Sequence, residues 1–206
     1  MARPRNITAP KRIDPDRCCG AIIDVQAFFL AQIDKRLRAL IETNTGFFAR
    51  LLGHLGIPMV VTLERPLDYK GVLPRSIGRH LSDLTRTFEK DFFDLTKEKD
   101  IIAHLGRLKK KQVIVAGCET DVCVMQSCLG LIARGYEVFV MEELLFSSTS
   151  NVDSAIDRMR SEGAVFLTYK TLYYELLESV ETSRPRARRA EALGPLPDDL
   201  PDTAVA

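Results

Sequence analysis

The sequence is poor in histidine and has no tryptophan, and the few histidines limit the metal sites that it could build. His54, His80 and His104 are far apart, and none belongs to the close pairs that are typical of zinc sites. We therefore expect no zinc site and no other cofactor.

Long apolar runs are also missing. No stretch approaches the roughly 20 apolar residues that are needed to span a bilayer. The opening stretch "MARPRNITAPKRIDPD" lacks the apolar centre of a secretory signal. These absences predict a cytoplasmic protein with no membrane partner.

Neither sign of charge prevails, since 29 Lys and Arg residues stand against 28 Asp and Glu residues. A net charge of +1 provides no global field to attract nucleic acid. The runs "KKK" and "SRPRARRA" raise nucleic-acid binding as a weak hypothesis, but such runs are usually solvated. We predict no nucleic-acid partner.

The five cysteines are a poor framework for disulfides, because their number is odd and Cys18 and Cys19 are adjacent. A chain of 206 residues can build a sizeable core without such bridges. We expect free thiols.

Apolar runs and segments with helical spacing alternate along the chain. The runs that indicate buried strands are "CCGAIIDV", "GIPMVVTLE", "KKKQVIVAGC", "GYEVFVME" and "GAVFLTY". The helical segments lie near residues 34–55, 98–109, 121–134, 150–162 and 171–179. This alternation predicts a three-layer α/β/α fold of Rossmann-like type, with a mainly parallel sheet covered by helices on both faces. We expect an N-terminal arm over residues 1–17, one domain over 18–180 and a flexible tail over 181–206.

The stretch from residue 65 to residue 97 breaks this alternation. It is rich in Pro and Gly, and it predicts at most a short helix near His80 and a short strand near "RTFEK". Long connections of this kind are often functional, so we expect substrate specificity to lie here.

Three candidates for chemistry follow predicted strands, where ligands bind to open parallel sheets. They are Asp24, Glu64 and the corner "GCETDVCV". Cys123 falls in the first turn of the following helix, where Thr120 or Asp121 could be the N-cap. The helix dipole at that position favours a thiolate and would lower the pKa of the thiol.

The other cysteines and the lone acid have plainer interpretations. Cys118 and Cys128 are more often simple packing than chemistry at such positions. No histidine follows a predicted strand, so a Cys–His pair is poorly supported. Asp24 could accept the proton of a thiol and a lysine could hold both charges, although an isolated Asp after a strand is more often a turn residue.

Three blocks of the sequence resemble the isochorismatase-like cysteine hydrolases, a superfamily that includes nicotinamidases and N-carbamoylsarcosine amidases. They are "AIIDVQAFF", "TFEKDFFD" and "VIVAGCETDVCVMQSCLGLIARGYEVFVMEELLFSS", in the family's order. The resemblance covers about residues 18–180. The third block is the most specific, because its Gly, Thr and Cys fall at the family's intervals.

The resemblance implies a catalytic triad in which Cys123 is the nucleophile, Asp24 the general base and Lys90 the third member. It also implies a cis peptide bond between Cys118 and Glu119, and an oxyanion hole made by the amides of Glu119 and Cys123. Nicotinamidases carry an Asp-x-His metal cluster after the second strand, whereas this chain has "TLERPLDYKG". That difference argues against a bound metal and against nicotinamidase activity.

The resemblance also suggests residues for substrate binding, namely Gln26, Phe28, Phe92 and Phe93, with Tyr69 as a further aromatic candidate. Exposed or core packing is an equally frequent explanation for the aromatic side chains.

The leading hypothesis is a metal-independent cysteine hydrolase acting on a small amide, carbamoyl or related compound, in a homo-oligomer that is a dimer or larger. Hydrolysis of a vinyl ether, as in isochorismatase, is one alternative. A non-catalytic binding or scaffold subunit of the same fold is the other.

Overall fold

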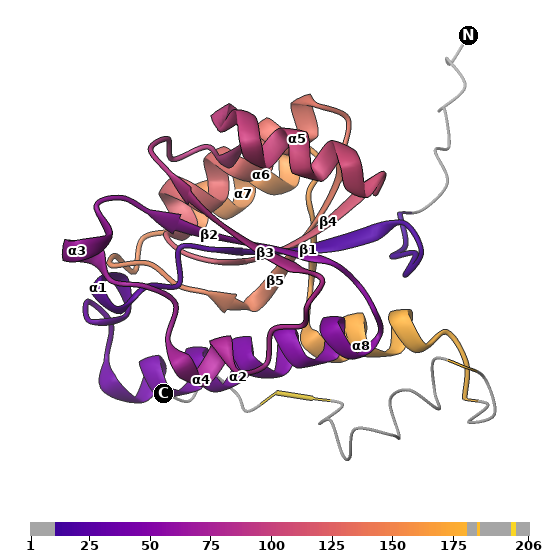
Figure 1. Cartoon of the computed structure of the whole chain (residues 1–206), viewed down its shortest axis with the longest axis horizontal. Helices are drawn as coiled ribbons and strands as arrows, with labels where there is room; N and C mark the ends of the chain where they lie inside the picture. Colours follow the sequence, from indigo (N-terminus) through magenta and orange to yellow (C-terminus); the bar gives the residue numbers. More distant parts are fainter. Residues whose placement is uncertain (1–10, 181–184, 186–198, 201–206) are drawn as a thin grey trace, which may run out of the picture.

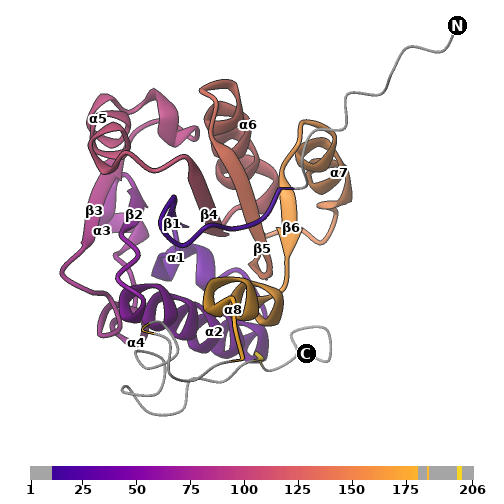
Figure 2. The same ribbon diagram turned by 90° about the vertical axis from the view of Figure 1, so that its right-hand side faces the viewer.

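The protein is built around one sheet of six parallel strands, in the order β3-β2-β1-β4-β5-β6 (Figures 1 and 2). The structure, a computed structural model, describes residues 11–180, 185 and 199–200. The strands are β1 (Cys18–Ile23), β2 (Met59–Glu64), β3 (Thr85–Lys90), β4 (Gln112–Gly117), β5 (Glu137–Leu145) and β6 (Val165–Leu167). All five strand pairings are parallel, so the predicted class of fold is confirmed.

Helices cover both faces of the sheet. On one face lie α2 (Lys35–His54) and α8 (Tyr169–Leu177), and on the other lie α5 (Lys99–Leu108), α6 (Met125–Ala133) and α7 (Asp153–Ser161) (Figure 2). Short turns of helix complete the chain: α1 (Ala27–Leu30), α3 (Leu67–Lys70), α4 (Arg75–Gly78), η1 (Leu95–Lys97) and η2 (Thr120–Val124). Among the described residues, no helix is both long enough and apolar enough to cross a membrane.

The apolar runs of β1, β2 and β4 are continuous because these central strands are buried at every position. In β4, Val113 and Val115 pack in the cluster with α5, α6 and α7, whereas Ile114 and Ala116 pack in the cluster with α2 and α8. Successive side chains of a strand point to opposite faces, so a strand between two helical layers needs apolar residues at every position.

The connection over residues 65–97 contains more regular structure than the sequence indicates. The predicted short strand is present as β3 at one edge of the sheet, and α4 lies just before His80 as expected. The short helices α3 and η1 were not predicted. The pairing of β3 with β2 sets Lys90 opposite Glu64, which carries both side chains to the same edge of the sheet.

The strand order reverses between β1 and β4, and this is where the ends of the two strands come closest. Gly117, the last residue of β4, has a φ of 127°, and a Cβ there would lie 2.0 Å from the carbonyl oxygen of Ile23. Only glycine fits this contact. In open parallel sheets such a reversal point is the usual place for a ligand.

The predicted N-terminal arm contributes to the core. Ile13 is buried in the cluster with α2 and α8, and its amide donates to Glu175 Oε2 at 2.9 Å. Packing of the described chain thus starts before Cys18, where we expected ordered structure to begin. The division into arm, domain and tail stays a prediction, and most of the predicted tail over 181–206 lies outside the described residues.

Candidate active site

The side chains of Asp24, Lys90 and Cys123 meet beyond the carboxyl ends of three different strands. Lys90 Nζ lies 2.7 Å from Asp24 Oδ2 and 3.6 Å from Cys123 Sγ. Asp24 and Lys90 are fully buried, and Cys123 is 2% exposed. The three residues singled out by the resemblance are therefore brought into one buried cluster.

Asp24 is held in place by backbone and side-chain contacts at the end of β1. Its φ of 53° turns the chain out of the strand, and its amide donates to the Thr62 carbonyl at 3.1 Å. The hydroxyl of Thr62 donates to Asp24 Oδ1 at 2.8 Å. Burial raises the pKa of Asp24, and the nearby charge and hydrogen bond of Lys90 partly offset this effect. Asp24 therefore binds a proton more tightly than an exposed carboxylate does.

Lys90 is the last residue of β3, and its ammonium group lies among acidic groups. Burial by itself would lower its pKa, but Asp24, Cys123 and Glu64 outweigh that effect and raise it. The side chain is therefore a permanent positive charge next to the sulfur.

Cys123 lies in a turn of π-helix that precedes α6, and the predicted N-caps do not cap this turn. The N-cap position is Glu119, without a side-chain capping bond. The Thr120 hydroxyl donates to the Phe146 carbonyl at 3.0 Å, and Asp121 accepts from the Ser147 hydroxyl. The expected cap is wrong because the loop after β5 competes for both side chains.

The expectation of a lowered thiol pKa at Cys123 is also wrong. Burial raises the pKa of Cys123 above its usual value, and the charge of Asp24 and the hydrogen bond to Glu64 raise it further. Lys90 acts in the opposite direction without prevailing. The helix start contributes a partial charge, whereas two carboxylates contribute full charges at short range. The resting sulfur is therefore a neutral thiol.

Cys118 and Glu119 form the bend that connects β4 to this turn, and the peptide bond between them is cis. The Cys118 thiol donates to the Asp24 carbonyl at 3.0 Å, which joins the ends of β1 and β4. Burial raises the pKa of Cys118 well above its usual value, so this thiol is neutral. Among the described residues the Glu119 amide donates no hydrogen bond to another backbone group.

Glu64 is also part of the cluster, although sequence analysis indicated it only as a candidate that follows a predicted strand. The Cys123 thiol donates to Glu64 Oε2 at 3.1 Å, and Lys90 Nζ lies 3.3 Å from the same oxygen. The other oxygen, Oε1, accepts from Lys70. Burial opposes ionisation of Glu64, but the hydrogen bonds from Lys70 and Cys123 lower its pKa overall. In the sequence, the position of Glu64 at the end of a predicted strand was the only feature that could have indicated its place in the cluster.

The three acidic groups Asp24, Glu64 and Cys123 lie within 4.8 Å of one another, close enough to share a metal ion. The ammonium of Lys90 contacts all three. A lysine that supplies the positive charge occupies the place where a cation would be needed, and the set includes no imidazole. The donor set therefore fits a lysine-centred site better than a metal site.

The residues predicted to bind substrate lie at different depths. Gln26 is fully buried, and its amide binds the backbone of Glu64 and Gly71. Phe28 stacks on Tyr69 with 5.0 Å between the rings. Phe92 and Phe93 follow Lys90 and are each 50% exposed. The contacts of Gln26 position backbone, while the substrate role of the aromatic residues stays a prediction.

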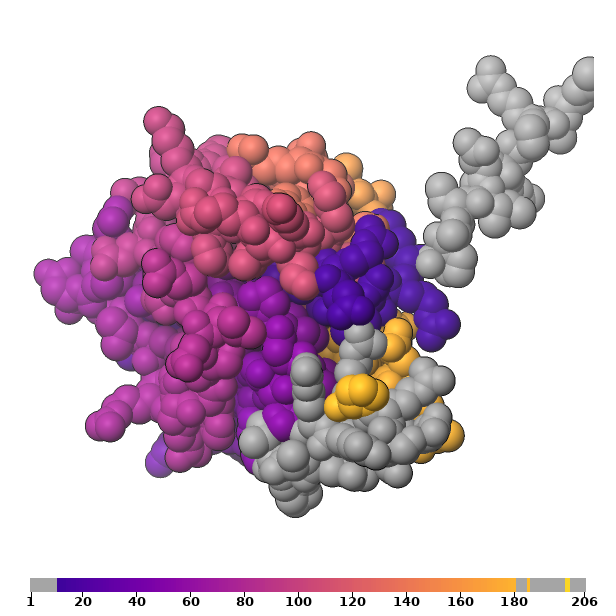
Figure 3. All heavy atoms as spheres, turned by 45° about the vertical axis from the view of Figure 1, so that its right-hand side comes forward, coloured from indigo at the N-terminus to yellow at the C-terminus, as the bar shows by residue number. Residues whose placement is uncertain are grey.

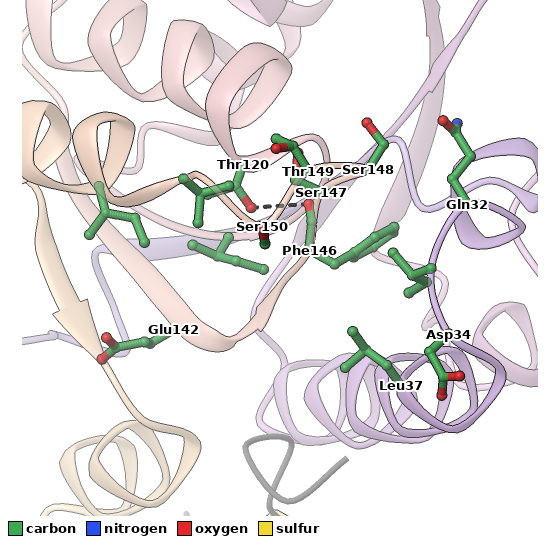
Figure 4. Close-up of a pocket in the computed structure, with 14 residues that line it drawn as sticks. Gln32, Asp34, Leu37, Thr120, Glu142, Phe146, Ser147, Ser148, Thr149 and Ser150 are labelled. Carbon is green, nitrogen blue, oxygen red and sulfur yellow. Dashed lines mark hydrogen bonds between the residues drawn. The ribbon is translucent and has the colours of Figure 1, made fainter.

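A cavity of about 410 Å³ is lined in part by Thr120, which directly follows the Cys118–Glu119 bend. Figure 4 shows Thr120 and Phe146 at its wall, with hydroxyl side chains of the loop after β5 beside them and Asp34 and Leu37 opposite. Asp24, Lys90 and Cys123 are not among its lining residues. The cavity borders the bend that carries the thiol but does not contain it.

The isochorismatase domain family matches residues 22–171 of the chain, a range that includes Asp24, Lys90 and Cys123. The protein therefore belongs to the isochorismatase family. It is 31% identical over 170 residues to the secreted isochorismatase effector Isc1 of Phytophthora sojae, a match that covers 80% of this chain and 79% of that protein.

Solved structures share the fold. The MAR1 ribonuclease of Caenorhabditis elegans has a TM-score of 0.83 at 24% identity, over 95% of this chain and 97% of that chain. YcaC of Escherichia coli, described as an octameric hydrolase of unknown specificity, has a TM-score of 0.76 at 24% identity, over 84% and 85% of the two chains. At these identities the likeness carries the fold, which is that of the isochorismatase-like hydrolases.

Proposed function

We propose that the protein is a metal-independent cysteine hydrolase, which cleaves a small amide, carbamoyl or related bond through a thioester on Cys123. The observation that carries the proposal is the buried contact of Lys90 Nζ with Asp24 at 2.7 Å and with Cys123 Sγ at 3.6 Å. Burying two such charges is unfavourable unless they are paired. The arrangement supplies a nucleophile, a base and a fixed cation.

In the first half of the reaction, Cys123 Sγ forms a bond to the carbonyl carbon of the substrate while its proton passes to Asp24. A neutral thiol needs this transfer during attack, and the raised pKa of Asp24 suits it to accept the proton. Lys90 stabilises the negative charge on the sulfur. The amides of Glu119 and Cys123 hold the oxyanion. The carbon–nitrogen bond then breaks, and the leaving nitrogen takes the proton from Asp24.

In the second half, water attacks the thioester. Asp24 takes one proton from the water as its oxygen bonds to the carbonyl carbon, and the carbon–sulfur bond breaks. The sulfur then regains a proton from Asp24, which restores the thiol. One amide and one water thus give one acid and one amine, and the enzyme ends in its starting state.

The decisive experiment is to incubate the full chain with a panel of small amides, ureido compounds and isochorismate, and to look for an acyl adduct on Cys123 by mass spectrometry. We expect turnover of an amide or ureido compound together with this adduct. Cys123→Ala should abolish both, and Asp24→Asn should lower the rate by about 100-fold or more, as loss of a general base does. Cys128→Ala is the matched control, because Cys128 is a buried thiol in the following helix whose pKa is raised by burial and not by the charges of the cluster.

Other outcomes would favour the alternatives. Cleavage of isochorismate that survives Cys123→Ala would replace the proposal with vinyl-ether hydrolysis. Absence of turnover for the whole panel, together with a Cys123 thiol whose alkylation rate does not respond to Asp24→Asn or Lys90→Met, would favour a non-catalytic subunit.

The partners belong to the proposal as well. We propose a small-molecule substrate, contacted by Phe28, Phe92 and Phe93, and no nucleic-acid partner. Because YcaC is described as octameric, assembly of this chain into a dimer or a larger oligomer is plausible, and we propose it. The cytoplasmic location stays a prediction.

A further inference from the structure

A second buried ion pair adjoins the triad. Glu64, the last residue of β2, binds Lys70 of α3 through Oε1 and accepts the Cys123 thiol at 3.1 Å through Oε2. The side chains of Lys70 and Glu64 are only 17% and 10% exposed. Solvent therefore screens their charges weakly. The carboxylate of Glu64 thus connects Lys70 directly to the sulfur.

The charges of the whole cluster balance only when Lys70 is counted. Asp24 and Glu64 contribute two negative charges, and Lys90 and Lys70 contribute two positive charges. With a neutral thiol, the net charge is zero. Without Lys70, the two carboxylates would share the ammonium of Lys90, which also contacts the sulfur. A buried group of charges tolerates such an imbalance poorly.

Gln26 fixes this second pair in place. Its Oε1 accepts from the Glu64 amide at 2.7 Å, and its Nε2 donates to the Glu64 carbonyl at 3.1 Å and to the Gly71 carbonyl at 2.7 Å. Gly71 directly follows α3, which carries Lys70. One buried amide thereby holds both the end of β2 and the end of α3, so the Glu64–Lys70 pair is a built part of the site.

We propose that Glu64 is a fourth catalytic residue, which accepts the hydrogen bond of the resting Cys123 thiol and restrains its ionisation until substrate arrives. Lys70 is a positioning residue that keeps Glu64 charged and leaves Lys90 to Asp24 and the sulfur. The inference rests on the proposed nucleophilic role of Cys123. Its consequence is a nucleophile that is protected from alkylation and oxidation in the empty site.

The test is the rate at which iodoacetamide labels Cys123 at pH 8 in the full chain, with each cysteine assigned by mass spectrometry. Glu64→Gln removes a negative charge beside the sulfur, so labelling should become at least about threefold faster. Removal of the charge lowers the pKa of Cys123 and increases the thiolate fraction, an effect partly offset by the lower nucleophilicity of that thiolate. Lys70→Met should act in the opposite direction and slow labelling at least twofold, because Lys90 is then drawn toward Glu64.

Matched controls separate charge from loss of structure. Glu89→Gln and Lys97→Met change exposed residues near the same strands and should leave the rate unchanged, and Lys70→Arg should retain the wild-type rate. Cys128 is an internal reporter, since faster labelling at this buried thiol indicates general opening of the fold. Each variant is also checked for its melting temperature.

The two proposals fail in different ways. If Asp24→Asn and Lys90→Met alter the labelling of Cys123 while Glu64→Gln and Lys70→Met behave like the controls, the role of Glu64 is wrong and the triad stands. Shifts of the same sign in Glu64→Gln and Lys70→Met would also overturn the role of Glu64. If none of these variants alters Cys123, the nucleophile assignment itself fails.

Discussion

Thr62 shows how a single hydroxyl sets the properties of the proposed base. Its Oγ1 donates to Asp24 Oδ1 at 2.8 Å, in a region where both residues are fully buried. Hydrogen bonds to a charged group favour the charged form. The Thr62 hydroxyl therefore holds the pKa of Asp24 below the value that burial alone would give, and it keeps the carboxylate available at a lower pH.

Thr62→Val should raise the pKa of Asp24 further. A hydrogen bond to a charged group contributes about 1.5 to 3 kcal/mol, and its loss favours the neutral form. The pKa of Asp24 rises in this variant, because the lost hydrogen bond from Thr62 stabilised only the charged carboxylate. The measurement is the pH titration of the Asp24 carboxyl carbon by NMR. Any pH profile of turnover that depends on ionised Asp24 should shift in the same direction.

Thr45 provides the matched control for this change. It is fully buried in α2, and its hydroxyl has no hydrogen-bond partner among the described residues. Thr45→Val should leave the Asp24 titration where it is in the wild type. An unchanged or lowered midpoint in Thr62→Val would contradict the assigned role of this hydroxyl.

At the scale of elements, the site depends on how closely β1 and β4 approach each other. Residues Ile23 and Gly117 are paired at the ends of these strands, and Asp24 and Cys118 follow them directly. The Cys118 amide and thiol both bind backbone carbonyls of the β1 end. This strand pair therefore fixes the distance between Asp24, the proposed base, and the bend that leads to Cys123, the proposed nucleophile.

Gly117→Ala should destabilise the protein by about 3 kcal/mol or more. A side chain at positive φ costs about 1 to 3 kcal/mol, and the overlap with the Ile23 carbonyl adds to it. Gly106→Ala is the control, because Gly106 lies in α5 with open space around it. This substitution should stabilise the protein by up to about 1 kcal/mol, because alanine favours the helix more than glycine does. Urea unfolding followed by circular dichroism compares the two, and equal midpoints would refute the close approach.

At the scale of the whole molecule, the start of the described chain is fastened to its other end. In Figure 3 the indigo segment lies beside orange atoms of the C-terminal part. The Lys11 ammonium donates to the Gly163 carbonyl at 2.5 Å, and the Ile13 amide donates to Glu175 of α8 at 2.9 Å. Gln112 of β4 also binds the backbone of Arg12. These contacts attach residues 11–13 to the packed part of the protein, although this segment precedes the first strand.

Ile13→Ala should cost about 2 to 3 kcal/mol of stability, because it removes buried methyl groups from the cluster with α2 and α8. Val180→Ala should change stability by less than about 0.5 kcal/mol, since Val180 is fully exposed. Urea unfolding of the full chain measures both. A loss for Ile13→Ala no larger than that for Val180→Ala would support the predicted boundary at residue 18.

Local patterns in the sequence were sufficient to predict the class of fold. Apolar runs and helical spacing are properties of neighbouring residues, so they indicated the strands β1, β2, β4, β5 and β6 and the long helices without reference to the rest of the chain. The burial of Ile13 was not predicted, because Ile13 is a single apolar residue among charges and prolines, with no period around it.

The sequence by itself determined the order of strands and helices, and with the family resemblance it indicated Asp24, Lys90 and Cys123. Only the tertiary structure decided that Glu64 and Lys70 join them, since the pairing of β2 with β3 and the bond of Gln26 to Gly71 after α3 are contacts between segments far apart in sequence. It also decided that the Cys123 thiol is neutral. The pKa of Cys123 depends on desolvation and on the charges of nearby carboxylates. Four separate segments of the chain contribute the side chains concerned, so no local sequence motif contains them all.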